Sequence, residues 1–364
     1  MRPVEMAGVG MTAFGRFPDR TLEDLGGEAV EAALADAGLD RTRLDAAYVG
    51  NVLGGGQVGP RVLERVGITG LPIVNVEAAC ASGSVAFRQA VRAVASGLED
   101  LALVVGVEQV SGHGVLSPLE ADRESVLGLT FPAVYAMVAR RELEQNGTTL
   151  TELAEVAVRN RAAGTGNPRA TLAKATSVEE VLASPMVADP LTRLQCGAHA
   201  DGAAAIVVAA PGLLPRHRPT VTVRAAAMVS GTSLRRQADI TEGDPTRRAA
   251  ALAYAEAGLG PADIDVAEVY DPFTIGEIVS VRALGLDRGR TAINPGGGLL
   301  GRGHAVGATG VAQLAELTWQ LRGEAGARQA GAPTTGLAQT VGGGPRGLDA
   351  IAAVVHVLSV KEDQ

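Results

Sequence analysis

Helical spacing of apolar residues alternates along the chain with short, unbroken apolar runs. Residues 21–37 have the pattern of an amphipathic helix, with Thr21 as its N-cap, Asp24 three residues later, and Gly38 as its stop. A helix of small residues is predicted over 82–95. The apolar runs predict strands at 46–52, 71–76, 101–107, 203–209 and 350–358. This alternation of strands and helices is typical of an α/β protein.

The second half of the chain repeats the first. Residues 33–49 (ALADAGLDRTRLDAAYV) and 253–269 (AYAEAGLGPADIDVAEV) match at an offset of 220 positions, as a helix end, a glycine stop, a short loop and a strand. The strand, turn and helix at 73–97 have a counterpart at 293–323, and each of these helices ends at a glycine. Two copies of one α/β unit imply a pseudo-twofold axis, across which the equivalent helix N-termini would face each other.

The segment from 113 to 195 interrupts this repeat. It is more polar, is richer in Arg, Glu and Thr, and carries helical patterns. We therefore predict an inserted loop domain at 113–195. The first half of the protein would then comprise 1–112 and 196–215, and the second half 216–364.

Composition narrows the class of protein. The 364 residues include 47 Gly but only 5 Phe, 4 Tyr and 1 Trp, so the core must be built from Ala, Val, Leu and Ile. The net charge is −8 and no run of Lys and Arg exceeds two residues, so we expect no nucleic-acid partner. No apolar stretch approaches the roughly 18 residues of a membrane span, and the N-terminus lacks a signal-peptide pattern, so we expect a cytoplasmic protein without membrane contact.

The two cysteines, Cys80 and Cys196, exclude a disulfide framework and a cysteine-rich zinc site. No metal site is predicted. Apart from the histidine described below, the histidines lack metal-ligand spacing and are expected to be structural: His113, His199, His217 and His356.

Cys80 stands in the segment NVEAACASGSVAF, between a predicted strand and a helix of small residues. This places its sulfur at a helix N-terminus, where the helix dipole and the free N–H groups favour a thiolate. The flanking Ala and Gly residues leave room for a ligand. Cys80 is therefore a candidate nucleophile, and a buried structural cysteine is the alternative.

His304 lies in a glycine-rich turn, NPGGGLLGRGHAVGATG, at the place in the repeat that corresponds to Cys80. A nearby imidazole would complete a Cys/His pair, as a base toward the thiol and a donor toward an oxyanion. A solvated loop histidine is the alternative. The glycine turn that begins at Gly342 offers backbone N–H groups to an oxyanion, although many such segments are only turns.

Together these segments resemble the thiolase superfamily, specifically the sterol-carrier-protein-type thiolases and their lipid-transfer-protein relatives. The resemblance covers nearly the whole chain and rests on 75–84 (NVEAACASGS), 196–205 (CGAHADGAAA), 294–310 and the turn at Gly342. It implies a five-layer α-β-α-β-α fold of two repeated halves, with the insertion 113–195 covering the substrate.

The resemblance also implies an acyltransferase that uses acyl-CoA, with coenzyme A as part of the substrate and no permanently bound cofactor. Cys80 would be acylated, His304 would activate it and line one oxyanion hole, and the N–H groups of Cys80 and Gly342 would form a second. A homodimer is implied, and relatives of this type pair with a small zinc-ribbon/OB-fold protein. Four arginines of the insertion could meet CoA phosphates, although a solvated face is the commoner role for any one of them: Arg159, Arg161, Arg169 and Arg193.

The sequence departs from the thiolase pattern where a second, acid/base cysteine is expected. Those positions hold Thr340 and Pro272, and Cys196 belongs to a structural segment. Tyr270 stands where the family has His or Asn, and its phenol could hydrogen-bond the oxyanion or act as an acid/base. Asp271 is expected mainly to brace the loop.

Three functions of different classes follow. The first is an acyltransferase working through an S-acyl Cys80, with or without formation or cleavage of a C–C bond. The second is a retro-aldolase acting on a CoA thioester with Tyr270 as acid/base, which the intact Cys80 motif disfavours. The third is a non-catalytic lipid-binding or scaffold protein, which predicts loss of Cys80 or His304. At an unperturbed pKa of about 10, only about one part in a thousand of Tyr270 is phenolate at pH 7, so we expect slow exchange of substrate α-protons.

Overall fold

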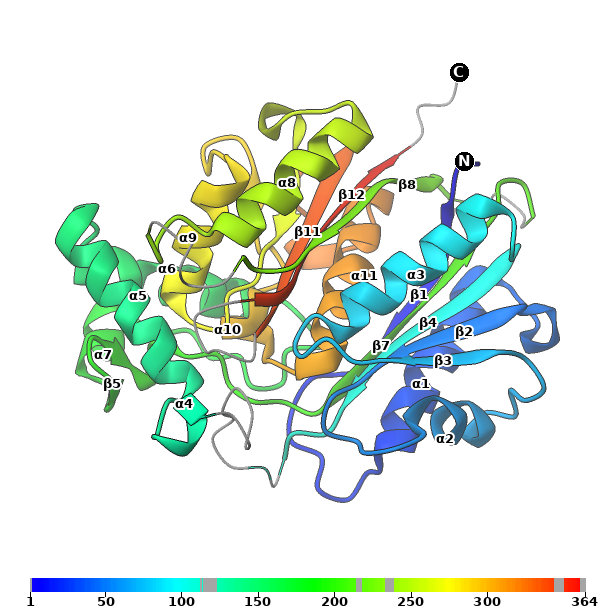
Figure 1. Ribbon diagram of the computed structural model, residues 1–364, viewed down its shortest axis with the longest axis horizontal. Helices are drawn as coiled ribbons and strands as arrows, with labels where there is room; N and C mark the ends of the chain where they lie inside the picture. Colours follow the sequence, from blue (N-terminus) through cyan, green and yellow to red (C-terminus); the bar gives the residue numbers. More distant parts are fainter. Residues whose placement is uncertain are drawn as a thin grey trace.

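The computed structural model describes residues 2–111, 113, 123–213, 218–232, 239–343 and 350–360. A mixed sheet of ten strands runs through the molecule in the order β10-β9-β11-β12-β8-β1-β7-β4-β2-β3 (Figure 1). In chain order these strands are β1 (Glu5–Met11), β2 (Ala46–Gly50), β3 (Ile73–Val76), β4 (Leu101–Glu108), β7 (Gly202–Ala209), β8 (Val221–Val229), β9 (Val266–Glu268), β10 (Ala292–Ile293), β11 (Thr335–Gly343) and β12 (Ala350–Val360).

The sheet consists of two five-stranded halves with the same topology. In the first half, β1 and β4 each pair antiparallel with β7, whereas β2 pairs parallel with β4 and β3. In the second half, β8 and β11 each pair antiparallel with β12, and β9 pairs parallel with β11 and β10. The halves join through the pairing of Glu5 in β1 with Thr222 in β8. This correspondence confirms the internal repeat predicted from the sequence.

Helices complete the five layers. Figure 1 shows α3 and α11 in the middle of the molecule, with the other helices on its outer faces. Three apolar clusters join these layers: one between the first half-sheet and α1 and α2, one around α3 and α11 between the two half-sheets, and one between the second half-sheet and α8 and α9. The bounds are α1 (Leu22–Ala37), α2 (Val58–Arg65), α3 (Ser82–Ser96), α8 (Asp244–Ala257), α9 (Thr274–Leu284), α10 (Gly298–Arg302) and α11 (Thr309–Arg322).

The N-termini of α3 and α11 meet across the pseudo-twofold axis, as the repeat predicts. A Cβ atom on Gly83 would lie 2.6 Å from the carbonyl oxygen of Gly307, and one on Gly310 would lie 2.0 Å from Oγ of Ser84. Because these contacts leave no room for a side chain, glycine is required for this close approach. The same contact brings the segments that precede the two helices, which carry Cys80 and His304, toward one another.

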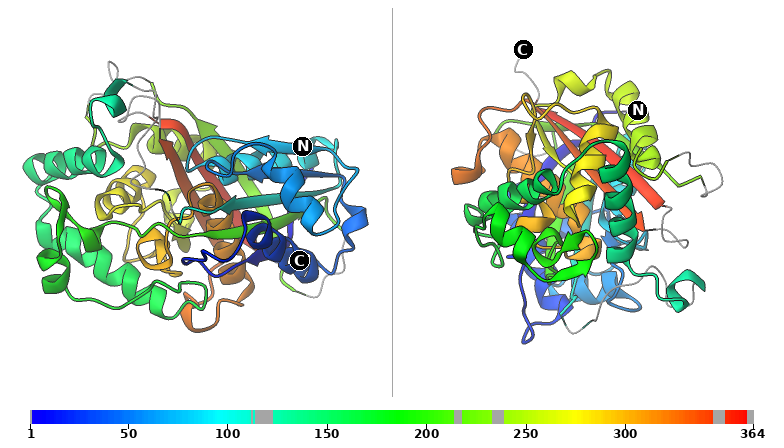
Figure 2. Two further views of the ribbon diagram at one scale, coloured as in Figure 1. Left: turned by 90° about the horizontal axis from the view of Figure 1, so that it is seen from below. Right: turned by 90° about the vertical axis from the view of Figure 1, so that its left-hand side faces the viewer.

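The segment predicted as an insertion folds outside the repeat, at one end of the molecule (Figure 2). Its described elements are α4 (Arg123–Val126), α5 (Phe131–Gln145), α6 (Leu150–Thr165), α7 (Val178–Ala183), β5 (Met186–Ala188) and β6 (Leu191–Thr192). The boundaries that we assigned to the three domains stay a prediction, and His217 lies outside the described residues.

Local sequence signals fix several element ends. Thr21 and Asp24 form a capping box at the start of α1, and Gly38 ends it in a left-handed conformation with φ of 59°, as predicted. The strand predicted at 46–52 ends at Gly50, because the backbone beyond it turns to donate hydrogen bonds to Glu108.

Candidate active site

A cavity of about 600 Å³ lies between the inserted segment and the second half of the protein. Apolar side chains of α5 and α9 form much of its wall. Cys80, Tyr270 and His304 line it together, although they are far apart in the sequence. The structure therefore brings the three predicted catalytic side chains into one cavity.

Cys80 sits on a sharp turn between β3 and α3. The preceding residue, Ala79, has a φ of +47°, a left-handed conformation that costs about 1–2 kcal/mol for a residue with a Cβ atom. The Ser82 hydroxyl holds this turn, accepting from the N–H of Ala78 at 2.9 Å and donating to the carbonyl of Ala79 at 2.6 Å. The strained turn directs a side chain that is only 8% exposed toward the cavity.

Gly342 lies directly behind this turn. A Cβ atom at Gly342 would be 2.2 Å from the carbonyl oxygen of Ala78, so β11 approaches the Cys80 turn more closely than any side chain allows. Its neighbours in the strand, Val341 and Gly343, line the cavity. This placement explains the glycine. The donation of the Gly342 N–H to an oxyanion stays a prediction.

His304 follows α10 and is held at both ring nitrogens. Nδ1 is 2.8 Å from Oγ1 of Thr309, and Nε2 is 3.4 Å from the hydroxyl of Tyr270. Burial, together with the neighbouring His199 and Arg302, lowers the pKa of His304 to about 3. The imidazole is therefore neutral at pH 7, when it can accept a proton or donate a hydrogen bond.

Tyr270 lies in the loop that follows β9. Its backbone N–H donates to Oε1 of Gln339 at 2.9 Å, its ring meets that of His304 edge to face at 5.6 Å, and its hydroxyl hydrogen-bonds the thiol of Cys80. Burial, followed by the charges on Cys80 and Tyr135, raises the pKa of Tyr270 well above its usual value. The phenol therefore stays protonated at pH 7 and acts as a hydrogen-bond donor.

Burial opposes the thiolate that the helix N-terminus was expected to favour at Cys80. The pKa of the thiol is raised to about 11. Burial makes the largest contribution to this increase, the hydrogen bond from Tyr270 opposes it, and the carboxylate of Glu108 adds to it. The helix N-terminus does not compensate for loss of solvent around the sulfur. As a nucleophile, the thiol would have to lose its proton during attack on a substrate.

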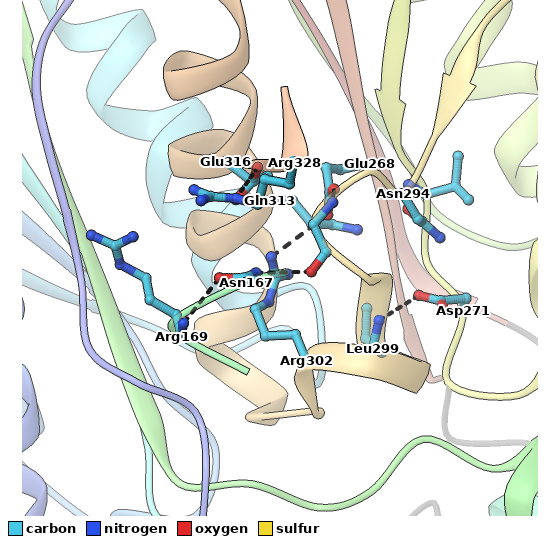
Figure 3. Close-up of polar contacts among 12 residues, drawn as sticks. Asn167, Arg169, Glu268, Asp271, Asn294, Leu299, Arg302, Gln313, Glu316 and Arg328 are labelled. Carbon is cyan, nitrogen blue, oxygen red and sulfur yellow. Dashed lines mark hydrogen bonds and ion pairs between the residues drawn. The ribbon is translucent and has the colours of Figure 1, made fainter. Parts of the chain in front are cut away.

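Asp271 is fully buried and holds the loop that leads to His304 (Figure 3). It accepts hydrogen bonds from the N–H groups of Leu299 at 2.7 Å and Leu300 at 3.3 Å, at the start of α10, and from Nδ2 of Asn160 at 2.8 Å. Burial, and then the charge of Glu277, raises the pKa of Asp271 well above its usual value. These contacts are those of a bracing residue that joins α6 and α10.

The positions where related enzymes carry a second thiol offer no acid/base group. Thr340 lies in the core, where it accepts from Oγ of Ser84 at 2.9 Å and donates to Oε1 of Gln313 at 2.6 Å. Pro272 lines the cavity without an exchangeable proton. Cys196 also lines it, but its thiol donates to the carbonyl of Thr192 at 3.4 Å and burial raises its pKa to about 12.

Two side chains of the cavity wall were not predicted from the sequence to belong to the site. His199, expected to be structural, lines the cavity, and so does Tyr135 of α5, which stacks on Phe273 at 4.6 Å between ring centroids. The only indication for His199 in the sequence was that it lies in 196–205, one of the segments that carry the family resemblance. Tyr135 sits in an ordinary helical pattern and gave no signal.

The arginines of the insertion divide into two groups. Arg161 and Arg193 line the cavity, and Arg16 from the first half joins them. Arg159 instead lies 3.8 Å from Glu277, and Arg169 packs over the ring of Trp319 at 4.0 Å. Contact of the first group with CoA phosphates stays a prediction.

The part of the chain that the structure describes holds no group of three or more His, Cys, Asp or Glu side chains placed to bind a metal ion. Within the same residues, no helix combines the length and the apolar character that crossing a membrane requires.

Comparisons with known proteins place the chain in a family. The thiolase N-terminal domain matches residues 4–211, and the thiolase C-terminal domain-like family matches 226–289 and 286–356. The chain is 40% identical to an acetyl-CoA acetyltransferase of Methanothermobacter thermautotrophicus, over 99% of this chain and 100% of that one. It is 37% identical to the benzoylsuccinyl-CoA thiolase subunit BbsB of Thauera aromatica, over 95% and 96% of the two chains.

Solved structures agree with this assignment. An aldolase complex, Ltp2-ChsH2(DUF35), contains a chain that superposes with a TM-score of 0.84 at 25% identity, covering 100% of this chain and 99% of that one. Human mitochondrial 3-ketoacyl-CoA thiolase shares the fold, with a TM-score of 0.79 at 20% identity over 99% of each chain. The repeated five-layer fold, the cysteine turn and the matching domains lead to one conclusion: the chain belongs to the thiolase family of acyltransferase enzymes.

Proposed function

We propose that the protein transfers an acyl group from acyl-CoA to a second substrate through an S-acyl intermediate on Cys80. The observation that carries this proposal is the convergence of Cys80, Tyr270 and His304 on one buried cavity. Two relatives named for acetyl-CoA acetyltransferase or CoA-thiolase activity support the substrate class. Coenzyme A enters as part of the acyl-CoA substrate and leaves as the free thiol.

In the first half-reaction, Sγ of Cys80 attacks the thioester carbonyl and its proton passes to Nε2 of His304. The Tyr270 hydroxyl hydrogen-bonds the thiol and lies 3.4 Å from that nitrogen, so it connects the two groups. The N–H groups of Cys80 and Gly342 would hold the oxyanion of the tetrahedral intermediate. The C–S bond to CoA then breaks, and the CoA thiolate takes the proton from His304.

The test is intact-mass spectrometry after incubation with a panel of acyl-CoAs. The parent protein should gain the mass of one acyl group, Cys80→Ser should gain none, and the matched variant Cys196→Ser should load like the parent. An adduct that persists in Cys80→Ser, or one that maps to Cys196 by peptide analysis, would contradict the proposal.

A retro-aldolase is the second candidate, favoured by the structural likeness to the Ltp2-ChsH2(DUF35) aldolase and by Tyr270. A lyase would cleave a β-hydroxyacyl-CoA without any covalent adduct. Cleavage of such a substrate by Cys80→Ser at the parent rate would support the lyase and exclude acyl transfer through Cys80.

We also propose a homodimer that works with a small zinc-ribbon/OB-fold partner in the cytoplasm. Similar chains are named as a subunit and as part of a complex containing a DUF35 protein, which supports a partner. Both cysteines are free, and a nucleophilic thiol persists in a reducing compartment. Light scattering coupled to size exclusion should give twice the chain mass, and a monomer alone would contradict the dimer.

A further inference from the structure

His199 lies on a short segment that is clamped against both loops of the site. The N–H of His304 donates to the carbonyl of Ala198 at 2.8 Å, and the N–H of Ala200 donates to the carbonyl of His304 at 3.1 Å. One step earlier, the N–H of Gly197 donates to the carbonyl of Pro272 at 2.8 Å. The pairing of His199 with His304 is parallel, so the two side chains leave the backbone on the same side.

The imidazole of His199 faces the cavity in a half-buried position. Among the described residues it makes no hydrogen bond or ion pair, whereas both ring nitrogens of His304 are engaged by Thr309 and Tyr270. Its charged and titratable neighbours are Arg16 and His304. A free imidazole therefore stands beside the acylation machinery.

Apart from His304, whose ring nitrogens are engaged by Thr309 and Tyr270 and which we assign to the acylation of Cys80, three further ionisable groups of the cavity are unsuited to remove a proton at neutral pH. Burial raises the pKa of the Tyr270 and Tyr135 phenols and of the Cys196 thiol, and each remains protonated. Burial lowers the pKa of His199, so its imidazole is neutral and carries a free lone pair. After acylation, His199 is the described side chain of the wall that combines a free lone pair with access to the cavity.

We propose that His199 is the general base of the second half-reaction, the transfer of the acyl group from Cys80 to the acceptor. This inference rests on the proposed acyltransferase function. It assigns to His199 the task that a second cysteine performs in related enzymes, and it suits acceptors with a hydroxyl or amine group.

The step balances without a further reactant. The acceptor O–H or N–H bond breaks, and its proton goes to a ring nitrogen of His199 while its electron pair attacks the acyl carbonyl. The resulting oxyanion collapses, the bond between the acyl carbon and Sγ of Cys80 breaks, and the imidazolium returns the proton to the Cys80 thiolate. The acylated acceptor and the free thiol are the products.

The experiment separates the two half-reactions. Acetyl-CoA is used to load the protein, excess reagent is removed, and decay of the acetyl-enzyme is followed by intact mass with water and with 1-butanol as acceptor probes. A positioned general base contributes about 10²–10⁴-fold, so His199→Gln should slow decay by at least about 100-fold. Its loading rate should stay within about threefold of the parent, which also shows that the variant is folded.

Two further variants make the result specific. Added imidazole should restore decay in His199→Ala, where the missing ring leaves space for it. His113→Gln, which removes an exposed histidine at the start of the insertion, should behave like the parent. The inference is overturned if acetyl-enzyme decay in His199→Gln stays within about threefold of the parent, or if imidazole restores nothing. Absence of loading in the parent would instead refute the proposed function on which the inference rests.

Discussion

Replacing Tyr270 by phenylalanine removes one hydroxyl group and keeps the ring, so the variant isolates what that hydroxyl does. The hydroxyl lies 3.4 Å from Nε2 of His304 and hydrogen-bonds the thiol of Cys80. As a donor it would orient these two groups during acylation. As a phenolate it would be the base of a thiolase or a lyase.

The two roles differ in the size of the rate effect that each would have. A neutral hydrogen bond contributes about 0.5–1.5 kcal/mol, which corresponds to about a 2- to 12-fold change in rate. A general base contributes about 10²–10⁴-fold, provided that its pKa lies near the working pH. Because burial raises the pKa of Tyr270 above its usual value of 10, fewer than about one phenol in a thousand is ionised at pH 7.

We therefore expect Tyr270→Phe to slow loading of Cys80 by about 2- to 12-fold and to leave α-proton exchange unchanged. Loading is measured by rapid-quench intact mass with acetyl-CoA, and exchange by NMR of deuterium uptake into acetyl-CoA in D₂O. Exchange in the parent should be much slower than loading. Tyr135→Phe, which removes the hydroxyl of another tyrosine of the cavity wall, is the matched control.

One result would refute this reasoning. If the parent exchanges α-protons as fast as it loads, and Tyr270→Phe abolishes exchange while loading persists, then the phenol is a working base despite its burial. The protein would then carry out carbanion chemistry, and the lyase would become the favoured function.

The remaining predictions concern three other residues. His304→Ala should slow loading by about 10²–10³-fold, because it removes both a proton acceptor and an oxyanion donor, and a loading rate within a few-fold of the parent would make His304 a simple loop residue. Gly342→Ala should displace the Cys80 turn and abolish loading, since its Cβ would meet a backbone oxygen at 2.2 Å. Gly336→Ala, whose Cβ would meet only side-chain ends, the nearest a leucine at 3.3 Å, should load normally, and equal rates in the two variants would contradict the packing argument. Burial lowers the pKa of His356 to about 3, so the unfolded chain takes up its proton below pH 6.5 while the folded chain does not, and stability is lost as the pH falls. Urea unfolding should show a free energy of unfolding that falls more steeply from pH 6.5 to 4.5 in the parent than in His356→Gln, by up to about 2–3 kcal/mol, and parallel curves would contradict a neutral buried imidazole.

The parts of the fold that were predictable are those with local causes. The capping box at Thr21, the glycine stops and the apolar runs each act within a few residues, and the repeat then dictates that the two halves share one topology. Strand ends depended on distant partners. The strand predicted at 46–52 ends at Gly50 because the carboxylate of Glu108, from another strand, accepts hydrogen bonds from the backbone N–H groups of Val52 and Leu53.

The residues of the candidate site were easier to predict from the sequence than their protonation states. Motifs selected Cys80 and His304, but the pKa of a side chain depends on what the whole fold places around it. A helix N-terminus suggested a thiolate, whereas burial keeps the thiol protonated. His199 was expected to be structural, because only the pairing of its segment with His304 in the folded protein shows that its ring faces the cavity.

The three central groups of the candidate site are therefore uncharged before a substrate binds. At pH 7 the thiol of Cys80, the phenol of Tyr270 and the imidazole of His304 are all neutral, each because the cavity wall excludes water. Charge then develops only as a thioester is attacked, where fixed donors on two loops and one helix end can stabilise it without reorganising. In the proposed mechanism the nucleophile Cys80 and the base His304 come from the equivalent turns before α3 and α11, so the duplication that builds the fold also fixes their relative position. What the duplication leaves open is the acceptor, and in our proposal that choice falls to the cavity wall beside the inserted segment, where His199 lies.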